Sequence, residues 1–337
     1  MKIFPEKRGL FNNEKGMALL LTILIIALMS VITSEFIQSR WHDRLAAANL
    51  SDGIRLSSIA RSGFQFALAT IVEEGKQNDY DTLHEAWTFT RELSEYSRDL
   101  FNSGHFEIEI QDQSGKIQIN NLINKNGEYN EEQRDLLTAL LSLEEFNLSP
   151  EEVDDIIDSI KDWIDPDDDV TQFGSEKAYY QSLEKPYTCR NAPLETLDEL
   201  LLIHHITPEI YYGTEETPGI KNFLTVYGKD GKININTANP FILKALSLVI
   251  LGQDLSEDWI KYRENEENDL SRYNLYQGLS DISKEQSAKA GTLLTTSSEI
   301  FKIISFGVFE EMKKGISSVV ERQKEGKDYQ ILSWEIL

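Results

Sequence analysis

The sequence predicts an α+β fold in which a long N-terminal transmembrane helix packs on an antiparallel sheet that is interrupted by a large helical insertion. Three observations lead to this prediction. Residues 17–34 carry no charged side chain. Apolar residues then recur at three- and four-residue steps as far as about Val72, which is the periodicity of a helix. In the last third of the chain, three segments alternate apolar and polar residues, as strands do.

The first element is the apolar run 17–34. At about 1.5 Å per residue it crosses most of a hydrocarbon layer roughly 30 Å thick. A secretory signal would have a shorter apolar core and a cleavage site behind it, whereas here the helical pattern continues. We therefore expect the anchor to be kept. Basic residues precede the run, which favours a cytoplasmic N-terminus and an exported head, although Arg40 and Arg44 weaken this asymmetry.

The next element is expected to be a β-hairpin, because residues 106–110 and 116–120 alternate around a turn at 113–115. The phrase at 115–120 returns at 231–236, and each copy is expected to stand at a turn into a strand. Further segments follow the helical period, and one of them begins with a Ser149 cap and proline at N1. The predicted helices are 131–143, 150–164, 194–203, 240–251 and 258–263, and the predicted C-terminal strands are 300–309, 316–322 and 329–334.

These elements divide the chain into consecutive parts. They are the transmembrane segment 17–34, the rest of the helix with the first hairpin (35–125), a helical insertion (126–230), a strand with a second helical part (231–295), and the C-terminal antiparallel strands (296–337).

The composition is strongly acidic, with 33 basic and 57 acidic side chains and a formal net charge of −24. Such a chain repels nucleic acid, and it suits partners that offer basic groups or divalent cations. Cys189 is the only cysteine, so the chain can form no internal disulfide and no CxxC metal site. No GxSxG, HExxH or phosphate-binding GxxxxGK[ST] motif occurs, and His204 and His205 are adjacent, which predicts ordinary helix residues. We expect no enzymatic activity.

The N-terminus resembles the leader of type IV pilins and type II secretion pseudopilins. Gly16 stands directly before the apolar run, behind the basic residues Lys2, Lys7, Arg8 and Lys15. The resemblance implies that a prepilin peptidase removes residues 1–16 by cutting between Gly16 and Met17. An ordinary membrane anchor with an incidental glycine is the alternative.

Several motifs together resemble the type II secretion minor pseudopilin K, and they span nearly the whole chain. They are the leader with its apolar helix, 162–165, 174–176, 179–180, 185–187, 190–194 and 232–239. The resemblance implies a subunit of the inner membrane, with one membrane span and a periplasmic head. It implies assembly with the minor pseudopilins I and J and with pseudopilus subunits, so that the complex caps or primes a pseudopilus for export across the outer membrane.

Two features of the long helix bear on assembly. Position five after the expected cut is Leu21, where major pilins and most pseudopilins carry a glutamate. A carboxylate in lipid needs a partner, and its absence is expected in the K family, where it implies a subunit at the tip with no neighbour ahead of it. Further along, Ile37, Trp41 and Leu45 are expected to form the apolar face that packs against partner helices.

An acidic segment is the candidate metal site. Asp165, Asp167, Asp169 and Glu176 fall at positions 1, 3, 5 and 12 of a loop, the spacing of an EF-hand. Position 6 is Val170 rather than glycine, so a true EF-hand is not expected. The resemblance implies calcium in another geometry, and a solvated acidic loop is the alternative.

Other functions remain open. The segment 232–239 is similar to a phrase that opens helix-hairpin-helix units of membrane-anchored DNA-uptake proteins, but the acidic residues that follow disfavour DNA. We expect this segment to end a strand and to cap the next helix through Asn236 or Thr237. A minor pilin of a type IV pilus and a metal-dependent periplasmic enzyme are the further alternatives.

Overall fold

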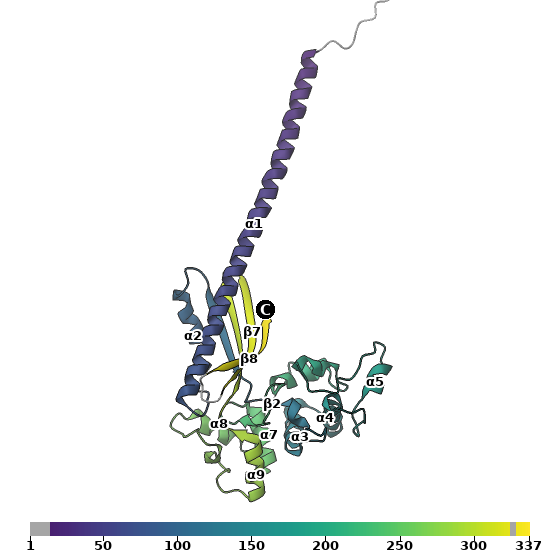
Figure 1. The fold of residues 1–337 in the computed structure, drawn as a ribbon, viewed down its shortest axis with the longest axis vertical. Coiled ribbons are helices and arrows are strands. Elements are labelled where there is room, and N and C mark those ends of the chain that lie inside the picture. Colours follow the sequence, from purple (N-terminus) through teal and green to yellow (C-terminus); the bar gives the residue numbers. More distant parts are fainter. Residues whose placement is uncertain (1–13, 324–327) are drawn as a thin grey trace, which may run out of the picture. The chain divides into compact units, whose positions relative to one another are not determined.

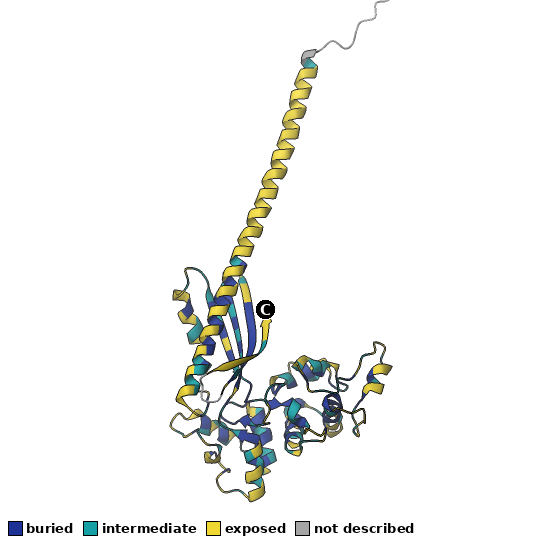
Figure 2. Cartoon of the chain, viewed as in Figure 1, coloured by how far each residue is buried: buried dark blue, intermediate teal, exposed yellow. Residues whose placement is uncertain are grey.

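The computed structural model describes residues 14–323 and 328–337. The chain divides into two compact units, residues 1–57 and 58–337. Helix α1 (Glu14–Gln77) is 64 residues long and begins in the first unit, which confirms the predicted long helix. Residues 17–34 are exposed throughout (Figure 2). Among the described residues, this is the one helix that is long and apolar enough to cross a membrane. Most of the predicted leader, residues 1–13, lies outside the described part.

The second unit contains a four-stranded sheet in the order β1-β6-β7-β8 (Figure 1). All three pairings are antiparallel, which confirms the predicted C-terminal meander and the α+β class. The strands are β1 (His105–Asp112), β6 (Ile300–Phe309), β7 (Met312–Arg322) and β8 (Tyr329–Ile336).

One face of this sheet packs on the C-terminal part of α1. Ile59, Phe64 and Ile71 of the helix are buried, and they share a hydrophobic cluster with side chains from β1, β6 and β7. The alternation in the strands is therefore the alternation between this core face and the opposite face. The strand residues of the cluster are Phe106, Ile108, Ile110, Phe301, Ile303 and Val320.

Strand β1 lies at one edge of the sheet, and the short helices that precede it in the chain cover this edge. After η1 (Ala86–Thr88) come α2 (Thr90–Tyr96) and η2 (Ser97–Asp99). The hydroxyls of Ser94 and Ser97 each accept a hydrogen bond, at 3.0 Å, from the backbone N–H of Ile108 and Phe106 respectively. These contacts satisfy donors that an edge strand would otherwise leave open.

The predicted hairpin at 106–120 was wrong. β1 pairs with β6, and the second segment forms only the two-residue strand β2 (Ile117–Gln118), which pairs in parallel with β3 (Leu224–Thr225). Both residues of β2 are buried, and the chain continues directly into the 3-10 helix η3 (Ile119–Leu122). Alternation over so few residues did not distinguish this buried turn from the exposed arm of a hairpin.

Residues between β1 and β6 form the helical insertion, which has one continuous hydrophobic core. The predicted helices at 131–143, 150–164, 240–251 and 258–263 are present, whereas 194–203 contains only a six-residue 3-10 helix. The elements are α3 (Glu131–Leu141), η4 (Glu144–Phe146), α4 (Pro150–Ile164), α5 (Lys177–Ser182), η5 (Leu197–Leu202), α6 (Pro208–Tyr212), η6 (Ile220–Asn222), α7 (Pro240–Leu251), α8 (Ser256–Glu264), η7 (Tyr273–Leu275) and α9 (Lys284–Leu293).

Each copy of the repeated phrase contains a short strand, as predicted. The second copy forms β4 (Ile233–Asn234), which pairs in parallel with β5 (Leu294–Thr295), just as β2 pairs with β3. The expected cap was wrong, however, because Asn239 caps α7 by accepting from the backbone N–H of Phe241 at 3.0 Å. Asn236 is instead buried, and it joins distant loops through hydrogen bonds to Asp81 and Leu270 carbonyls.

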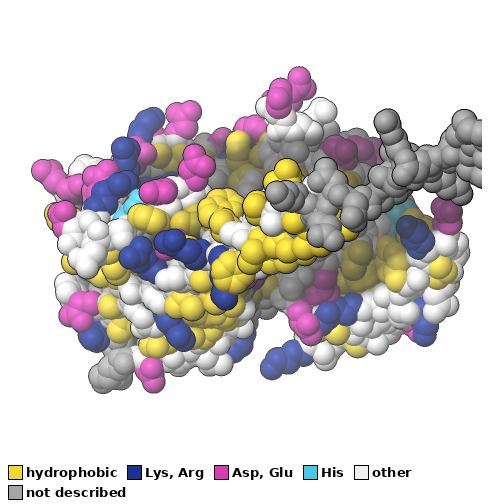
Figure 3. All heavy atoms as spheres, turned by 90° about the horizontal axis from the view of Figure 1, so that it is seen from above, with side chains coloured by type: hydrophobic (Ala, Val, Ile, Leu, Met, Phe, Trp, Pro, Cys, Tyr) yellow, Lys and Arg dark blue, Asp and Glu magenta, His cyan; other side chains and the backbone are white. Residues whose placement is uncertain are grey.

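Charge is distributed widely over the surface. On the face shown in Figure 3, acidic side chains are spread over the outline with basic ones among them. The net charge of −24 therefore does not arise from a single patch on that face.

Candidate functional site

The residues predicted to act in processing and assembly lie on α1. Gly16, Met17 and Leu21 are helical, and the side chains of Met17 and Leu21 are exposed. Ile37, Trp41 and Leu45 are also exposed, Trp41 to 63 %. Large apolar side chains in such numbers on one helix are unfavourable in water, which indicates lipid or partner helices as their surroundings.

A cluster of three buried carboxylates lies in the helical insertion. Asp162 and Asp165 come from the last turns of α4, and Glu176 is the N-cap of α5. The exposed fractions of these residues are 0, 0 and 2 %, and ligand oxygens of the three lie within 4.8 Å of one another. In the described ranges this is the one group of acidic, His or Cys side chains with the proximity that a metal ion needs.

Local contacts at both ends of α4 position the helix and the loop behind it around this cluster. A complete capping box between Ser149 and Glu152 starts α4, with Pro150 at N1. At the other end, both oxygens of Asp162 accept from the backbone N–H of Thr171 at 3.1 Å, and this contact folds the loop 166–176 back onto the helix. Gly174 makes this possible, because a Cβ there would collide with the Asp162 carboxylate.

The electrostatics of the cluster favour a cation. Lys161 Nζ lies 2.7 Å from Asp165 Oδ2, and within the described part of the chain it is the only basic group that forms an ion pair with the three carboxylates. Burial raises the pKa of Asp162 to about 6 and that of Glu176 to about 7, and it also raises the pKa of Asp165. Asp165 Oδ1 and Glu176 Oε1 are buried without any hydrogen-bond partner. A hard divalent cation would supply both the missing charge and the missing partner, so these residues fit calcium.

The structure brings together only part of the predicted ligand set. Asp165 and Glu176 lie in the cluster, whereas Asp167 and Asp169 are exposed outside it, and Asp167 accepts the backbone N–H of Asp169 at 2.9 Å. Sequence reasoning missed Asp162 as a ligand. A signal was available, because residues three apart on a helix share a face, and Asp162 precedes Asp165 by three.

A second polar contact, between Ser175 and His204, also lies beside this cluster. Ser175 Oγ is 2.7 Å from His204 Nδ1, and burial lowers the pKa of His204. His204 and His205 are not helix residues as expected, since they form a turn behind η5 with His205 at φ 66°. Among the described residues no carboxylate hydrogen-bonds His204, so the arrangement lacks the third member of a hydrolytic triad.

The segment behind α7 is acidic, and its arginine is buried. Arg263 of α8 is buried and donates to the carbonyl oxygen of Ala238 at 2.6 Å, so its guanidinium is used inside the protein. Around it the segment is acidic. A phosphate backbone would meet repulsion here.

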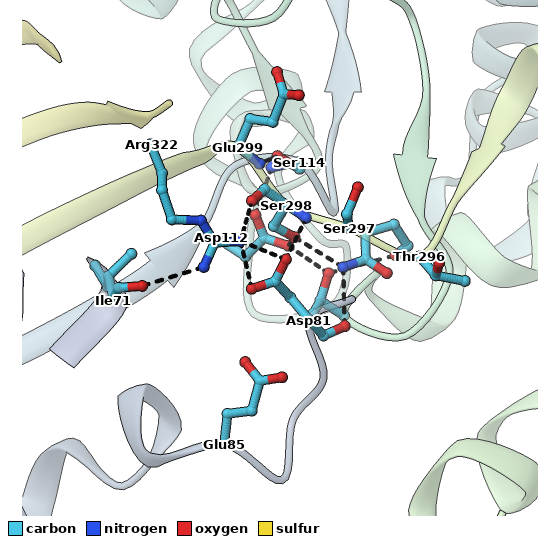
Figure 4. A network of polar contacts seen from close by, with 12 residues as sticks. Ile71, Asp81, Glu85, Asp112, Ser114, Thr296, Ser297, Ser298, Glu299 and Arg322 are labelled. Atoms are coloured by element: carbon cyan, nitrogen blue, oxygen red, sulfur yellow. Dashed lines mark hydrogen bonds and ion pairs between the residues drawn. The ribbon is translucent and has the colours of Figure 1, made fainter. Parts of the chain in front are cut away.

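A buried polar network connects the sheet, the end of α1 and the helical insertion (Figure 4). Arg322 at the end of β7 donates to the Asp81 carboxylate and to the carbonyl oxygens of Ile71 and Ser298. Ser298 also donates to Asp112 at 2.5 Å, and burial raises the pKa of Asp112 to about 6. The helix α1, the loop behind it, the ends of β1 and β7 and the segment before β6 are thereby held at one point.

Comparisons with known proteins agree with this architecture and confirm the resemblance to protein K. Residues 115–215 match the family model "Type II secretion system (T2SS), protein K". The chain is 21 % identical to type II secretion system protein K of Pseudomonas aeruginosa over 337 residues, covering 94 % of this chain and 91 % of that protein. It is 25 % identical to the Aeromonas hydrophila protein of the same name, covering 72 and 74 %.

A solved structure has the same fold. The match is to a chain in the crystal structure of the GspK-GspI-GspJ complex from the enterotoxigenic Escherichia coli type 2 secretion system. The TM-score is 0.66 at 17 % identity, and the alignment covers 86 % of this chain and 98 % of that one.

Proposed function

We propose that the chain is a minor pseudopilin of the protein K type, which assembles with minor pseudopilins I and J and caps or primes a type II secretion pseudopilus. The observation that carries the proposal is the similarity to named K proteins along 94 % of the chain, together with the shared fold of a chain from a GspK-GspI-GspJ complex. Its role is structural rather than enzymatic.

The long helix supplies the means of assembly. Ile37, Trp41 and Leu45 offer exposed apolar surface just behind the most hydrophobic stretch. Two partner helices would cover this surface, and burial of apolar area stabilises the contact by about 25 cal/mol per Å². The helical insertion gives the head a bulk that an ordinary hairpin-based head would lack, and this bulk stops further growth at the tip.

Processing prepares the helix for this role. A prepilin peptidase in the inner membrane cuts between Gly16 and Met17, and the new N-terminus is methylated, with the head in the periplasm. Leu21 removes the carboxylate that would otherwise require the amine of a preceding subunit, which suits the first position in the filament. Intact-mass measurement of the protein from membranes should give a chain that begins at Met17, and a chain that still begins at Met1 would contradict this step.

The three buried carboxylates hold a structural calcium ion in this proposal. The ion would join the end of α4 to the start of α5 through Asp162, Asp165 and Glu176. It would fix the loop of the head and take no part in the helix contacts.

Co-purification with I and J homologues tests the proposal. In detergent, Trp41→Asp with Leu45→Asp should abolish recovery of the complex, because two charges would be buried in an apolar contact. Ser39→Asp is the matched control, since residue 39 lies on the opposite side of the helix from Trp41 and is exposed. Retained complex in the double variant would contradict the proposal. A stable complex with type IV pilus subunits instead would favour the minor-pilin alternative.

A further inference from the structure

A cleft of about 560 Å³ lies where the sheet meets the helical insertion. Strands β6, β7 and β8 line one side of it, and η5, η6 and β3 contribute to the other. The face of the sheet concerned is opposite to the one that packs on α1, because Lys302 lies between Phe301 and Ile303 of the α1 core. Most of the cleft lies on this opposite face, while Trp334 of its lining reaches the ring of Phe64 in α1, with 5.0 Å between the ring centres. None of the three buried carboxylates lines it.

Two lysines, Lys116 and Lys302, line the same cleft, and Lys116 is half-buried. Burial and then the positive charge of Lys302 lower the pKa of Lys116 to about 8, whereas the negative charges of Asp112 and Glu109 act in the opposite direction. Neither lysine forms an ion pair or a side-chain hydrogen bond with any described residue. In a chain with 57 acidic and 33 basic side chains, two lysines that line one cleft and form no close ion pair with a described carboxylate are an unexpected arrangement.

Gln113 supplies an uncharged donor at the same place. Its side chain lines the cleft, the residue is only 5 % exposed, and Nε2 has no hydrogen-bond partner. Leaving such a buried donor unsatisfied costs about 1–3 kcal/mol. The backbone fixes its position relative to Lys116, because Gln113 N–H donates to Ile300 at 2.8 Å and Lys116 N–H donates to Gln113 at 3.2 Å.

The balance of charge indicates the kind of anion. Lys116, Lys221 and Lys302 line the cleft together with Asp198 and Glu335. Three ammonium and two carboxylate groups leave one unit of positive charge, which suits a monoanion better than a doubly charged phosphate. Lys221 already makes a cation–π contact, since its Nζ lies 4.3 Å from the centre of the Tyr212 ring.

The rest of the lining is mixed, with apolar or aromatic residues beside hydrogen-bonding ones. The first kind includes Leu224, Val226, Tyr227 and Val319, and the second includes Thr196, Asn222, Thr225, Ser317 and Ser333. A ligand that fills the cleft therefore has partners for apolar and for hydrogen-bonding groups beside its charge. A peptide segment, with aliphatic side chains and backbone amides flanking an aspartate or glutamate, has this chemistry, whereas an inorganic ion does not.

We propose that this cleft binds a peptide segment of another protein through one carboxylate, which Lys116, Lys302 and the Gln113 amide hold together. The carboxylate takes charge-assisted hydrogen bonds from the two ammonium groups, and Gln113 Nε2 donates the third bond. This site is independent of the assembly role proposed for the long helix.

Lysine footprinting on the full chain in detergent tests the site. The protein is acetylated briefly in the presence of the peptide acetyl-Val-Asp-Val-amide, of the matched acetyl-Val-Asn-Val-amide, or of inorganic phosphate, and each lysine is quantified by mass spectrometry. We expect only the aspartyl peptide to slow acetylation of Lys116 and Lys302. Lys314, which is exposed on β7, is the internal control and should react at the same rate throughout.

Variants then assign the contacts. Gln113→Leu and Lys302→Met retain the apolar parts of the side chains, and each should weaken protection of Lys116 at least about tenfold, since the bound carboxylate loses one charge-assisted hydrogen bond. Unchanged far-ultraviolet circular dichroism would show that the variants fold. Equal protection by the asparaginyl peptide or by phosphate, or full protection in both variants, would overturn the assignment. Absence of protection by the aspartyl peptide in the unmodified protein would overturn it as well.

Discussion

Arg322 and Asp81 form a buried ion pair in which one guanidinium nitrogen lies 2.7 and 2.6 Å from the two carboxylate oxygens. They are 9 and 2 % exposed. Their separation in sequence is large, yet the pair decides how the head is held together, because Arg322 also donates to the Ile71 carbonyl of α1 at 3.2 Å. The sheet, the helix and the loop behind the helix thus share one polar connection.

Breaking this pair should be costly. Asp81→Asn leaves the buried Arg322 charge without compensation, and we expect the free energy of unfolding to fall by about 3–5 kcal/mol. Urea unfolding of the full chain in detergent, followed by tryptophan fluorescence, measures the change. The control is Lys313→Met, which breaks an exposed pair with Glu107 and should cost less than about 1 kcal/mol. Similar losses in the two variants would contradict the special role of the buried pair.

The close approach of α1 to the sheet depends on Gly63. A Cβ at this position would lie 2.9 Å from Phe106 Cβ and would collide with Ser305 Oγ, which donates to the Ala60 carbonyl at 2.8 Å. Gly63→Ala should therefore destabilise the head by about 1–3 kcal/mol through overpacking, as urea unfolding would measure.

Gly291 provides the matched comparison for this prediction. It lies in α9, and the nearest atom to an added Cβ is Tyr273 Oη at 3.9 Å. Gly291→Ala should stabilise the protein by about 0.5–1 kcal/mol, because alanine has the higher helix propensity. The same substitution is thus expected to have opposite signs at the two positions. A stabilising Gly63→Ala would show that the helix does not contact the sheet at this distance.

Long helices and strands were predictable from the sequence, because their apolar periodicity is evident whichever elements they pack against. The predicted bounds of β6 and α7, 300–309 and 240–251, are those that the structure has. In α7 the apolar run and proline at N1 are local signals. Strand β6 alternates over ten residues, which is long enough for the core face to be evident.

Short segments whose conformation depends on distant residues were not predictable. Strand β2 follows β1 by a few residues, but it pairs with β3 more than 100 positions later. Asparagine is a common helix cap, yet the side-chain amide of Asn236 donates hydrogen bonds to the carbonyl oxygens of Asp81 and Leu270 instead. The predicted metal ligands were partly wrong for the same reason. The spacing of the acidic residues could not show that the Thr171 N–H bonds to Asp162 and that Asp167 is left in solvent. No pattern in the neighbouring sequence records these contacts.

Calcium should bind to the buried cluster rather than to the exposed aspartates. Calorimetric titration of the full chain in detergent should show one site that Asp162→Asn or Glu176→Gln abolishes, and that Asp167→Asn and Asp169→Asn leave nearly unchanged. At a free calcium concentration of 100 Kd, the ion should stabilise the protein by about 2.7 kcal/mol.

Folding of the metal-site variants can be checked without calcium. Under these conditions Glu176→Gln should be at least as stable as the unmodified protein, because it removes a carboxylate that burial and the charge of Asp162 disfavour. Loss of calcium binding in Asp169→Asn, with normal binding in Glu176→Gln, would restore the exposed aspartates as the ligands.

Asp112 should make the stability of the head depend on pH. Its carboxylate accepts hydrogen bonds from Ser298 and Thr237, which favour the charged form, but burial outweighs them and raises its pKa from 3.8 to about 6. The folded state therefore holds this proton more tightly than the unfolded state. The resulting stabilisation is fully present below about pH 4 and is lost as the pH rises through about 6.

Comparison with Asp112→Asn isolates this effect. The difference in unfolding free energy between the unmodified protein and the variant should fall by up to about 3 kcal/mol between pH 4 and pH 7, at 1.36 kcal/mol per pKa unit. Ser298→Ala removes a donor to the ionised carboxylate, so the midpoint of the loss should move above pH 6 in this variant. Urea unfolding at a series of pH values measures both. A constant difference across this range, or a midpoint that Ser298→Ala moves downward, would show that burial does not dominate at Asp112.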